Sequence, residues 1–142
     1  MNFQLDPRLA ADSKPIAQWP LSELRLMDDS QYPWLILVPR LPGARELIDL
    51  TDSDRQQLQR EMDAAARLLR HAFKPDKLNI AALGNVVEQL HVHIIARFRN
   101  DAAWPRPVWG VHPAKPRTPD EHAALLARLE PHLPCFALEK IA

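Results

Sequence analysis

The sequence predicts an α+β domain in which an antiparallel β-sheet carries one long packed helix, with a second helix toward the C-terminus. Short apolar segments typical of strands lie on both sides of a long segment whose apolar residues recur every three or four positions. Neighbouring strand segments are joined by connections too short for a parallel crossover, which favours antiparallel pairing. Strands before and after a single long helix are typical of this fold class.

The N-terminal residues, 1–20, are expected to form an irregular arm with one helical turn. They combine mixed polarity with Pro7, Pro15 and Trp19. Trp19 is expected to pack on the body of the domain.

A β-hairpin is expected over residues 24–38. Its strands are 24–27 and the continuous apolar run 34–38, which is typical of a buried strand. The turn between them contains Asp28 and Asp29, whose side chains can hydrogen-bond their own backbone. These two carboxylates either shape the turn or contact the hydroxyl groups of a ligand.

The longest helix is expected over residues 51–73. Thr51 or Ser53 can cap its N-terminus, because Asp54 or Gln56 follows three residues later as in a capping box. One apolar stripe is expected to face the sheet and four arginines to face largely outward. The stripe comprises Leu58, Met62, Ala65, Ala66, Leu69 and Phe73, and the arginines are Arg55, Arg60, Arg67 and Arg70.

After this helix, the pattern predicts a strand over 78–83, a turn at Gly84-Asn85 and a strand over 89–97. Residues 89–94 alternate strictly between polar and apolar, which places Gln89, His91 and His93 on one strand face. Imidazole suits nucleophilic and acid–base chemistry near neutral pH. By spacing alone, the pattern favours a solvated polar face, and a metal site and a catalytic site are the two alternatives.

The segment 99–117 is rich in proline and tryptophan, and it is expected to be either a lid or partner surface, or a packed loop. A helix is then predicted to begin at Thr118, because Pro119 and Glu121 complete a favourable N-terminal sequence. Its apolar face is supplied by Leu125, Leu126 and Leu129, and Pro131 ends it.

Length and composition exclude several classes of protein. The 142 residues suit one domain, 1–142, with a core over 24–98, the arm 1–20 and a C-terminal part over 99–142. Eighteen basic and eighteen acidic residues cancel, so neither nucleic-acid binding nor membrane binding is expected. The single cysteine excludes an internal disulfide, and no apolar run is long enough to span a bilayer. Without an N-terminal signal pattern, a cytoplasmic protein is expected.

Residues 89–95, Gln-Leu-His-Val-His-Ile-Ile, resemble the motif of the histidine triad family, which reads His-apolar-His-apolar-His-apolar-apolar. The surroundings are also similar to that family. The run 34–39 resembles the strand that precedes its Val-Pro turn, 48–51 resembles its entry into the long helix, and Gly84-Asn85 lies where the family contacts substrate. The resemblance covers about half of the chain, 24–98.

This resemblance implies a homodimeric α+β protein that binds a nucleotide, with a purine nucleotide expected, and attacks its α-phosphate without a metal or other cofactor. His91, the middle motif position, corresponds to the family's nucleophile, which forms a covalent nucleotidyl-histidine. His93 would hydrogen-bond the phosphoryl or leaving group, and Asn85 would approach the phosphate. Asp28 or Asp29 lies where the family contacts the ribose.

Gln89 departs from the family pattern, because it occupies the position of the first motif histidine. An amide can donate and accept hydrogen bonds but does not titrate near neutral pH. Gln89 is therefore expected to position groups around His91. Two alternatives to a nucleotidyl hydrolase or transferase stay open: a nucleotide-binding protein with vestigial activity, and a metal-binding protein using His91 and His93. A third metal ligand would have to come from His112 or His122.

Overall fold

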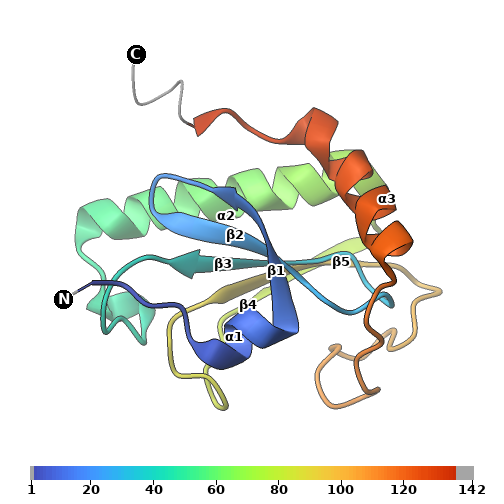
Figure 1. Cartoon of the computed structure of the whole chain (residues 1–142), viewed down its shortest axis with the longest axis horizontal. Helices are drawn as coiled ribbons and strands as arrows, with labels where there is room; N and C mark the ends of the chain where they lie inside the picture. Colours follow the sequence, from blue (N-terminus) through green and yellow to red (C-terminus); the bar gives the residue numbers. More distant parts are fainter. Residues whose placement is uncertain (1, 137–142) are drawn as a thin grey trace.

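The computed structural model describes residues 2–136, and in it five strands form one antiparallel sheet in the order β1-β2-β3-β5-β4 (Figure 1). The predicted fold class is confirmed. The strands are β1 (Ser13–Gln18), β2 (Ser22–Met27), β3 (Trp34–Pro39), β4 (Lys77–Ala81) and β5 (Val92–Arg97). The helices are α1 (Pro7–Asp12), η1 (Leu47–Asp49), α2 (Asp52–Phe73), α3 (Pro119–Leu129) and η2 (Glu130–His132).

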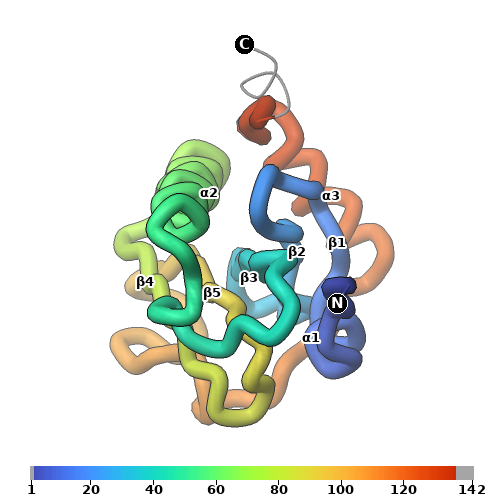
Figure 2. The backbone as a smooth tube through the Cα atoms, turned by 90° about the vertical axis from the view of Figure 1, so that its left-hand side faces the viewer, coloured from blue at the N-terminus to red at the C-terminus, as the bar shows by residue number. Residues whose placement is uncertain are grey.

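Two apolar clusters cover the two faces of the sheet. The first joins the sheet to α2 and includes Leu24, Leu37, Leu58, Leu69 and Ile94. The second joins Leu9 of α1 and residues of the loop after β5 to side chains of β3 and β5; its members include Tyr32, Trp34, Ile36, Ile95, Ala103 and Val108. Figure 2 shows α2 above the strands and α1 below them. Both faces of the sheet are therefore covered at its centre, where β3 and β5 are buried along their whole length.

The predicted long helix is confirmed as α2. The Thr51 hydroxyl accepts a hydrogen bond from the backbone N–H of Asp54 (3.1 Å), which satisfies one of the free N–H groups of the first turn. The predicted helix start at Thr118 is also confirmed, and Thr118 and Glu121 form a capping box at the N-terminus of α3. Within residues 2–136, no helix combines the length and apolar character needed to cross a bilayer.

The expectation of an irregular N-terminal arm is wrong over residues 13–18, which form the edge strand β1. Its ladder with β2 is irregular between Pro15 and Ala17, as expected for a proline confined to a sheet edge. The local pattern did not reveal this strand, because its pairing depends on β2. The expected helical turn is present as α1, and Trp19 is buried in the first apolar cluster as predicted.

A buried carboxylate connects α2 to the start of β2. The two carboxylate oxygens of Glu61 accept hydrogen bonds from the backbone N–H groups of Leu21 and Ser22 (2.8 and 2.9 Å). Glu61 lies on the inner face of α2 and is fully buried. Its negative charge is stabilised because both oxygens have donors in a place that water does not reach.

Candidate active site

His91 and His93 lie side by side, with ring centroids 4.8 Å apart. They are on the face of the sheet that the second apolar cluster covers. His93 belongs to β5, between β3 and β4, and His91 immediately precedes that strand. Both residues are buried, with 7% and 4% of their surfaces exposed. The close packing around both imidazoles therefore restricts their orientations.

The ring of His91 is oriented by the backbone of its own segment. Its Nδ1 atom lies 2.7 Å from the carbonyl oxygen of Gln89. A carbonyl oxygen only accepts, so Nδ1 carries the proton in this hydrogen bond. In the neutral ring, the Nε2 atom of His91 then keeps a free lone pair, as a nucleophile requires.

The ring of His93 has the opposite tautomer. The indole Nε1–H of Trp34 donates to its Nδ1 atom at 2.9 Å. Burial, and then the neighbouring His91, lower the pKa of His93 from its ordinary value of 6.5 to about 3. His93 is therefore neutral near pH 7, with its proton on Nε2.

The alternation predicted that Gln89, His91 and His93 share one face of a strand over 89–97. The strand ladder begins only at Val92, so Gln89 and His91 both precede the regular strand. The side chain of Gln89 turns to the N-terminal segment. The side-chain oxygen accepts from the backbone N–H of Asp6 (2.9 Å), and the side-chain nitrogen donates to the carbonyl of Gln4 (2.8 Å). In this arrangement Gln89 joins the N-terminal arm to the backbone carbonyl that orients His91.

Two cavities lie near the histidine pair. The first, of about 280 Å³, is lined by Arg45, Glu46, Leu47, Ile48, Ala82, Leu83, Gly84, Gln89, Leu90 and His91. Gly84 has φ +78°, a left-handed conformation that favours glycine, and it brings the backbone to this cavity. Asn85 follows it as an exposed residue.

The second cavity, of about 360 Å³, contains both acidic residues of the predicted ribose contact. Its lining includes Asp12, Asp28, Asp29, Trp34, Trp109 and His112. Asp29 shapes the turn, because its Oδ1 accepts from the backbone N–H and the side-chain amide of Gln31 (3.1 and 3.0 Å). Asp28 accepts from the backbone N–H of Arg117 at 2.9 Å. The structure thus places Asp28 and Asp29 at one cavity and His91 at the other.

The proline- and tryptophan-rich segment is a packed loop that covers the histidine face. Ala103 and Val108 are buried in the second apolar cluster. Trp109 packs edge-on against both Trp34 and His93, with centroids 5.8 and 5.1 Å away. Sequence reasoning missed Trp34 and Trp109 as site residues. The concentration of tryptophans in this segment was a signal for Trp109, whereas Trp34 lies in β3 and was read only as part of an apolar strand.

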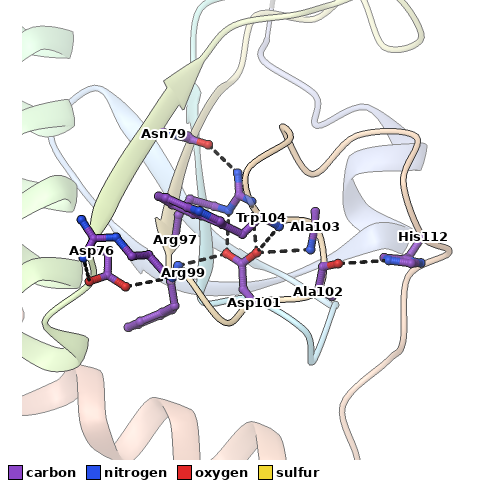
Figure 3. A network of polar contacts seen from close by, with 10 residues as sticks. Asp76, Asn79, Arg97, Arg99, Asp101, Ala102, Ala103, Trp104 and His112 are labelled. Atoms are coloured by element: carbon purple, nitrogen blue, oxygen red, sulfur yellow. Dashed lines mark hydrogen bonds and ion pairs between the residues drawn. The ribbon is translucent and has the colours of Figure 1, made fainter.

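The start of this loop is held by a buried ion pair. Arg97, at the end of β5, donates to both carboxylate oxygens of Asp101 (2.8 and 3.1 Å) and to the side-chain oxygen of Asn79 (Figure 3). Asp101 also accepts from three backbone N–H groups of the loop, those of Phe98, Ala103 and Trp104. Burial raises the pKa of Asp101, but the hydrogen bonds from Arg97 and the backbone outweigh it and keep this pKa below its ordinary value.

The end of the loop is held by Arg117. Its guanidinium donates to the backbone carbonyls of Met27 and Tyr32 (both 2.7 Å) on either side of the β2–β3 turn. With both ends fastened to the sheet, the loop keeps Trp109 against the histidine pair.

The chain is similar to known proteins in sequence and in fold. The family profile described as HIT domain matches residues 8–100. A histidine triad protein from Bradyrhizobium japonicum is 47% identical, with 94% of this chain and 99% of that chain covered and a TM-score of 0.91. One from Sinorhizobium meliloti is 45% identical (92% and 97% covered, TM-score 0.89), and one from Marinobacter aquaeolei is 44% identical (94% and 97% covered, TM-score 0.91).

Among curated protein sequences, none matches this chain. The family profile spans well over half of the chain, and three solved histidine triad proteins share its fold over nearly their whole length. The chain therefore belongs to the histidine triad (HIT) family.

Proposed function

We propose that the protein is a nucleotidyl hydrolase or transferase with His91 as its covalent nucleophile. The observation that carries this proposal is the hydrogen bond from His91 Nδ1 to the Gln89 carbonyl, which leaves a lone pair on Nε2 beside a second, neutral imidazole. The substrates are nucleoside monophosphate conjugates or dinucleoside polyphosphates.

The reaction takes place in two steps. The lone pair of His91 Nε2 attacks the α-phosphorus, a nitrogen–phosphorus bond forms, and the leaving group departs with the electron pair of its broken bond to phosphorus. Water or another acceptor then attacks the same phosphorus and releases its proton to the solvent, and His91 leaves with its electron pair. The N–H of His93 stabilises the charge that develops on the phosphoryl oxygens.

The nucleotide is expected to extend from His91 toward the β2–β3 turn, with its ribose near Asp28. Asp29 already accepts two hydrogen bonds from Gln31 through one oxygen and is almost fully buried, so Asp28 is the better ribose partner. The phosphate is expected beside Gly84 and Asn85, because Gly84 lines the cavity that contains His91. A purine nucleotide is the expected ligand.

A homodimer is also proposed, on the evidence of exposed apolar side chains near the free edge of the sheet. β4 pairs with β5 on one side and is the last strand of the sheet. Ile80 of β4 is 46% exposed, and Ile48 and Val86 are 82% and 72% exposed. Exposed apolar side chains beside an unpaired strand edge suit pairing with a second copy.

The metal-binding alternative has less support. Within residues 2–136, no group of three or more histidine, cysteine, aspartate or glutamate side chains is arranged to hold a metal ion. The remaining alternative is a nucleotide-binding protein with vestigial activity. It shares the fold and the cavities with the proposed enzyme, so only a chemical test separates the two.

The test is to incubate the protein with a dinucleoside polyphosphate or an adenosine 5′-phosphoramidate, and to search for a nucleotidyl adduct by intact-protein mass spectrometry. We expect an adduct on wild type and none on His91→Ala. His71→Ala, at an exposed histidine of α2, is the matched control and should keep the adduct. Turnover retained in His91→Ala would refute the nucleophile. Nucleotide binding without turnover of any substrate would favour the binding-only alternative.

A further inference from the structure

The hydrogen bond between Trp34 and His93 determines which hydrogen-bonding role His93 can take. An indole N–H is a donor and has no lone pair to offer, so the Nδ1 atom that faces it must be an acceptor. The two atoms are 2.9 Å apart, and both residues are buried on adjacent strands. If His93 were protonated, its Nδ1–H would point at the N–H of Trp34, leaving two buried donors without an acceptor.

The two neighbouring rings are therefore oriented in complementary ways. Both Nδ1 atoms form hydrogen bonds within the protein. That of His91 donates to the Gln89 carbonyl, and that of His93 accepts from the indole N–H of Trp34. Both Nε2 atoms are left for a substrate, as a lone pair on His91 and an N–H on His93. The low pKa of His93, caused by burial and by His91, agrees with a ring that stays neutral.

We propose that Trp34 is a positioning residue that keeps His93 a neutral hydrogen-bond donor, so that the enzyme favours leaving groups that depart without a proton. The proposal rests on the proposed function and narrows its substrates. It favours phosphoric and mixed anhydrides, whose leaving groups are stable anions, over phosphoramidates, whose amine must be protonated to leave.

The chemistry follows from where protons are available. When His91 Nε2 bonds to phosphorus, the bond from phosphorus to the leaving group breaks and its electron pair goes to the leaving group. A phosphate or carboxylate accommodates that charge, whereas an amine needs a proton from an acid. A neutral imidazole N–H hydrogen-bonds but is too weak an acid to supply that proton, and the amide of Gln89, in place of the first motif histidine, does not titrate.

The first experiment reads the tautomer directly and needs no activity. Nitrogen-15 NMR of the histidine side chains in the full-length protein should show His93 protonated on Nε2 alone from pH 7 down to pH 5. Trp34→Phe keeps an aromatic ring but removes the donor, so His93 should show mixed tautomers and a higher pKa. Trp109→Phe alters a ring that packs edge-on against His93 while keeping the Trp34 hydrogen bond, so it should retain the wild-type tautomer.

The second experiment measures leaving-group dependence. A series of adenosine 5′-monophosphate aryl esters with leaving groups of decreasing acidity should show a steep fall in kcat/KM with wild type. Wild type should turn over an anhydride substrate at least about 100-fold faster than a phosphoramidate. The reason is that general acid catalysis, which the amine leaving group needs, contributes about 10²–10⁴-fold to the rate where an acid is present. Trp34→Phe should flatten this dependence and add an acidic limb to the pH profile, changes that loss of stability alone would not produce.

Either measurement can overturn the proposal. A proton on Nδ1 of His93 in wild type would disprove the role of Trp34 even if Trp34→Phe did not fold. Phosphoramidates used as fast as anhydrides would disprove the substrate preference while leaving the nucleophilic role of His91 intact. If no substrate is turned over, the proposed function and the substrate preference fail together, and the tautomer result still decides the role of Trp34.

Discussion

The side-chain oxygen of Gln89 accepts a hydrogen bond from the backbone N–H of Asp6, 83 residues earlier in the chain. The same amide donates to the carbonyl of Gln4, so one side chain holds two points of the N-terminal arm. Its backbone carbonyl orients His91. The arm and the nucleophile are thus connected through a single residue.

We predict that Gln89→Ala lowers the rate by roughly tenfold to a hundredfold, comparable with the loss of one or two oriented hydrogen bonds. Gln89→Glu should have a smaller effect, since its carboxylate still accepts from Asp6 but cannot donate to Gln4. Gln89→His should be tolerated. Steady-state kinetics of the three variants provide the check, and abolition of activity by Gln89→Ala as complete as by His91→Ala would contradict a positioning role.

The pair formed by Arg97 and Asp101 should be essential for stability. Asp101→Asn leaves the buried guanidinium without its counter-ion, and breaking a buried pair costs about 3–5 kcal/mol. Glu88→Gln breaks the exposed pair with Arg45 and should cost at most about 1 kcal/mol. Urea denaturation of both variants measures the difference. Equal costs would show that the network of Figure 3 contributes no more than a surface pair.

Protonation of His93 should destabilise the folded state as the pH falls. Its folded pKa of about 3 lies below the ordinary value of 6.5, so between these values the unfolded chain binds the proton and the folded chain does not. The contribution of His93 to the free energy of unfolding is therefore fully present above about pH 6.5 and declines toward pH 3. Between pH 7 and pH 5 the free energy of unfolding should fall by about 2 kcal/mol because of this residue.

His93→Asn is the matched variant for this prediction, because its side-chain oxygen can still accept from Trp34 but cannot titrate in this range. Chemical denaturation of both proteins at pH 7 and pH 5 gives the difference directly. The same decline in stability in both would show that other groups account for it.

Glu61 should matter more for stability than an ordinary acidic residue of a helix. Glu61→Ala removes the acceptors of two buried backbone N–H groups, each worth about 1–3 kcal/mol when left unsatisfied. Glu61→Gln keeps one acceptor oxygen, so its free energy of unfolding should fall by about half as much as that of Glu61→Ala. Asp63→Ala, at an exposed position of α2, should change the free energy of unfolding by less than about 0.5 kcal/mol. Thermal or urea unfolding of the series tests this order, and a neutral Glu61→Ala would contradict it.

Substitution of exposed apolar residues should test the dimer. Ile80→Asp together with Ile48→Asp places charges near the free edge of the sheet, where a buried interface would not accept them. Wild type should sediment as a dimer at micromolar concentration and the double variant as a monomer. Leu47, 41% exposed, is a neighbouring position whose conservative change to Met should leave the dimer intact. A monomeric wild type would remove the proposal.

Local patterns in the sequence were sufficient for the fold class, for α2 with its cap narrowed to Thr51 or Ser53, and for the existence of the strands β3 and β5. These features repeat over a few residues, so periodicity and capping reveal them without knowledge of distant contacts. The motif at 89–95 likewise singled out His91 and His93. The strand β1 was missed because its own residues show no strand pattern, and it is a strand only through its hydrogen bonds to β2.

Only the tertiary structure determined the chemical state of the histidine pair. Trp34 reaches His93 across 59 residues of chain, and Gln89 reaches Asp6 across 83. A hydrogen bond depends on where two side chains meet in space, and residue spacing along one strand does not contain that information. The sequence therefore identified which residues could carry the chemistry, and long-range packing decided the tautomer of His93, because it places the indole N–H of Trp34 against one particular ring nitrogen.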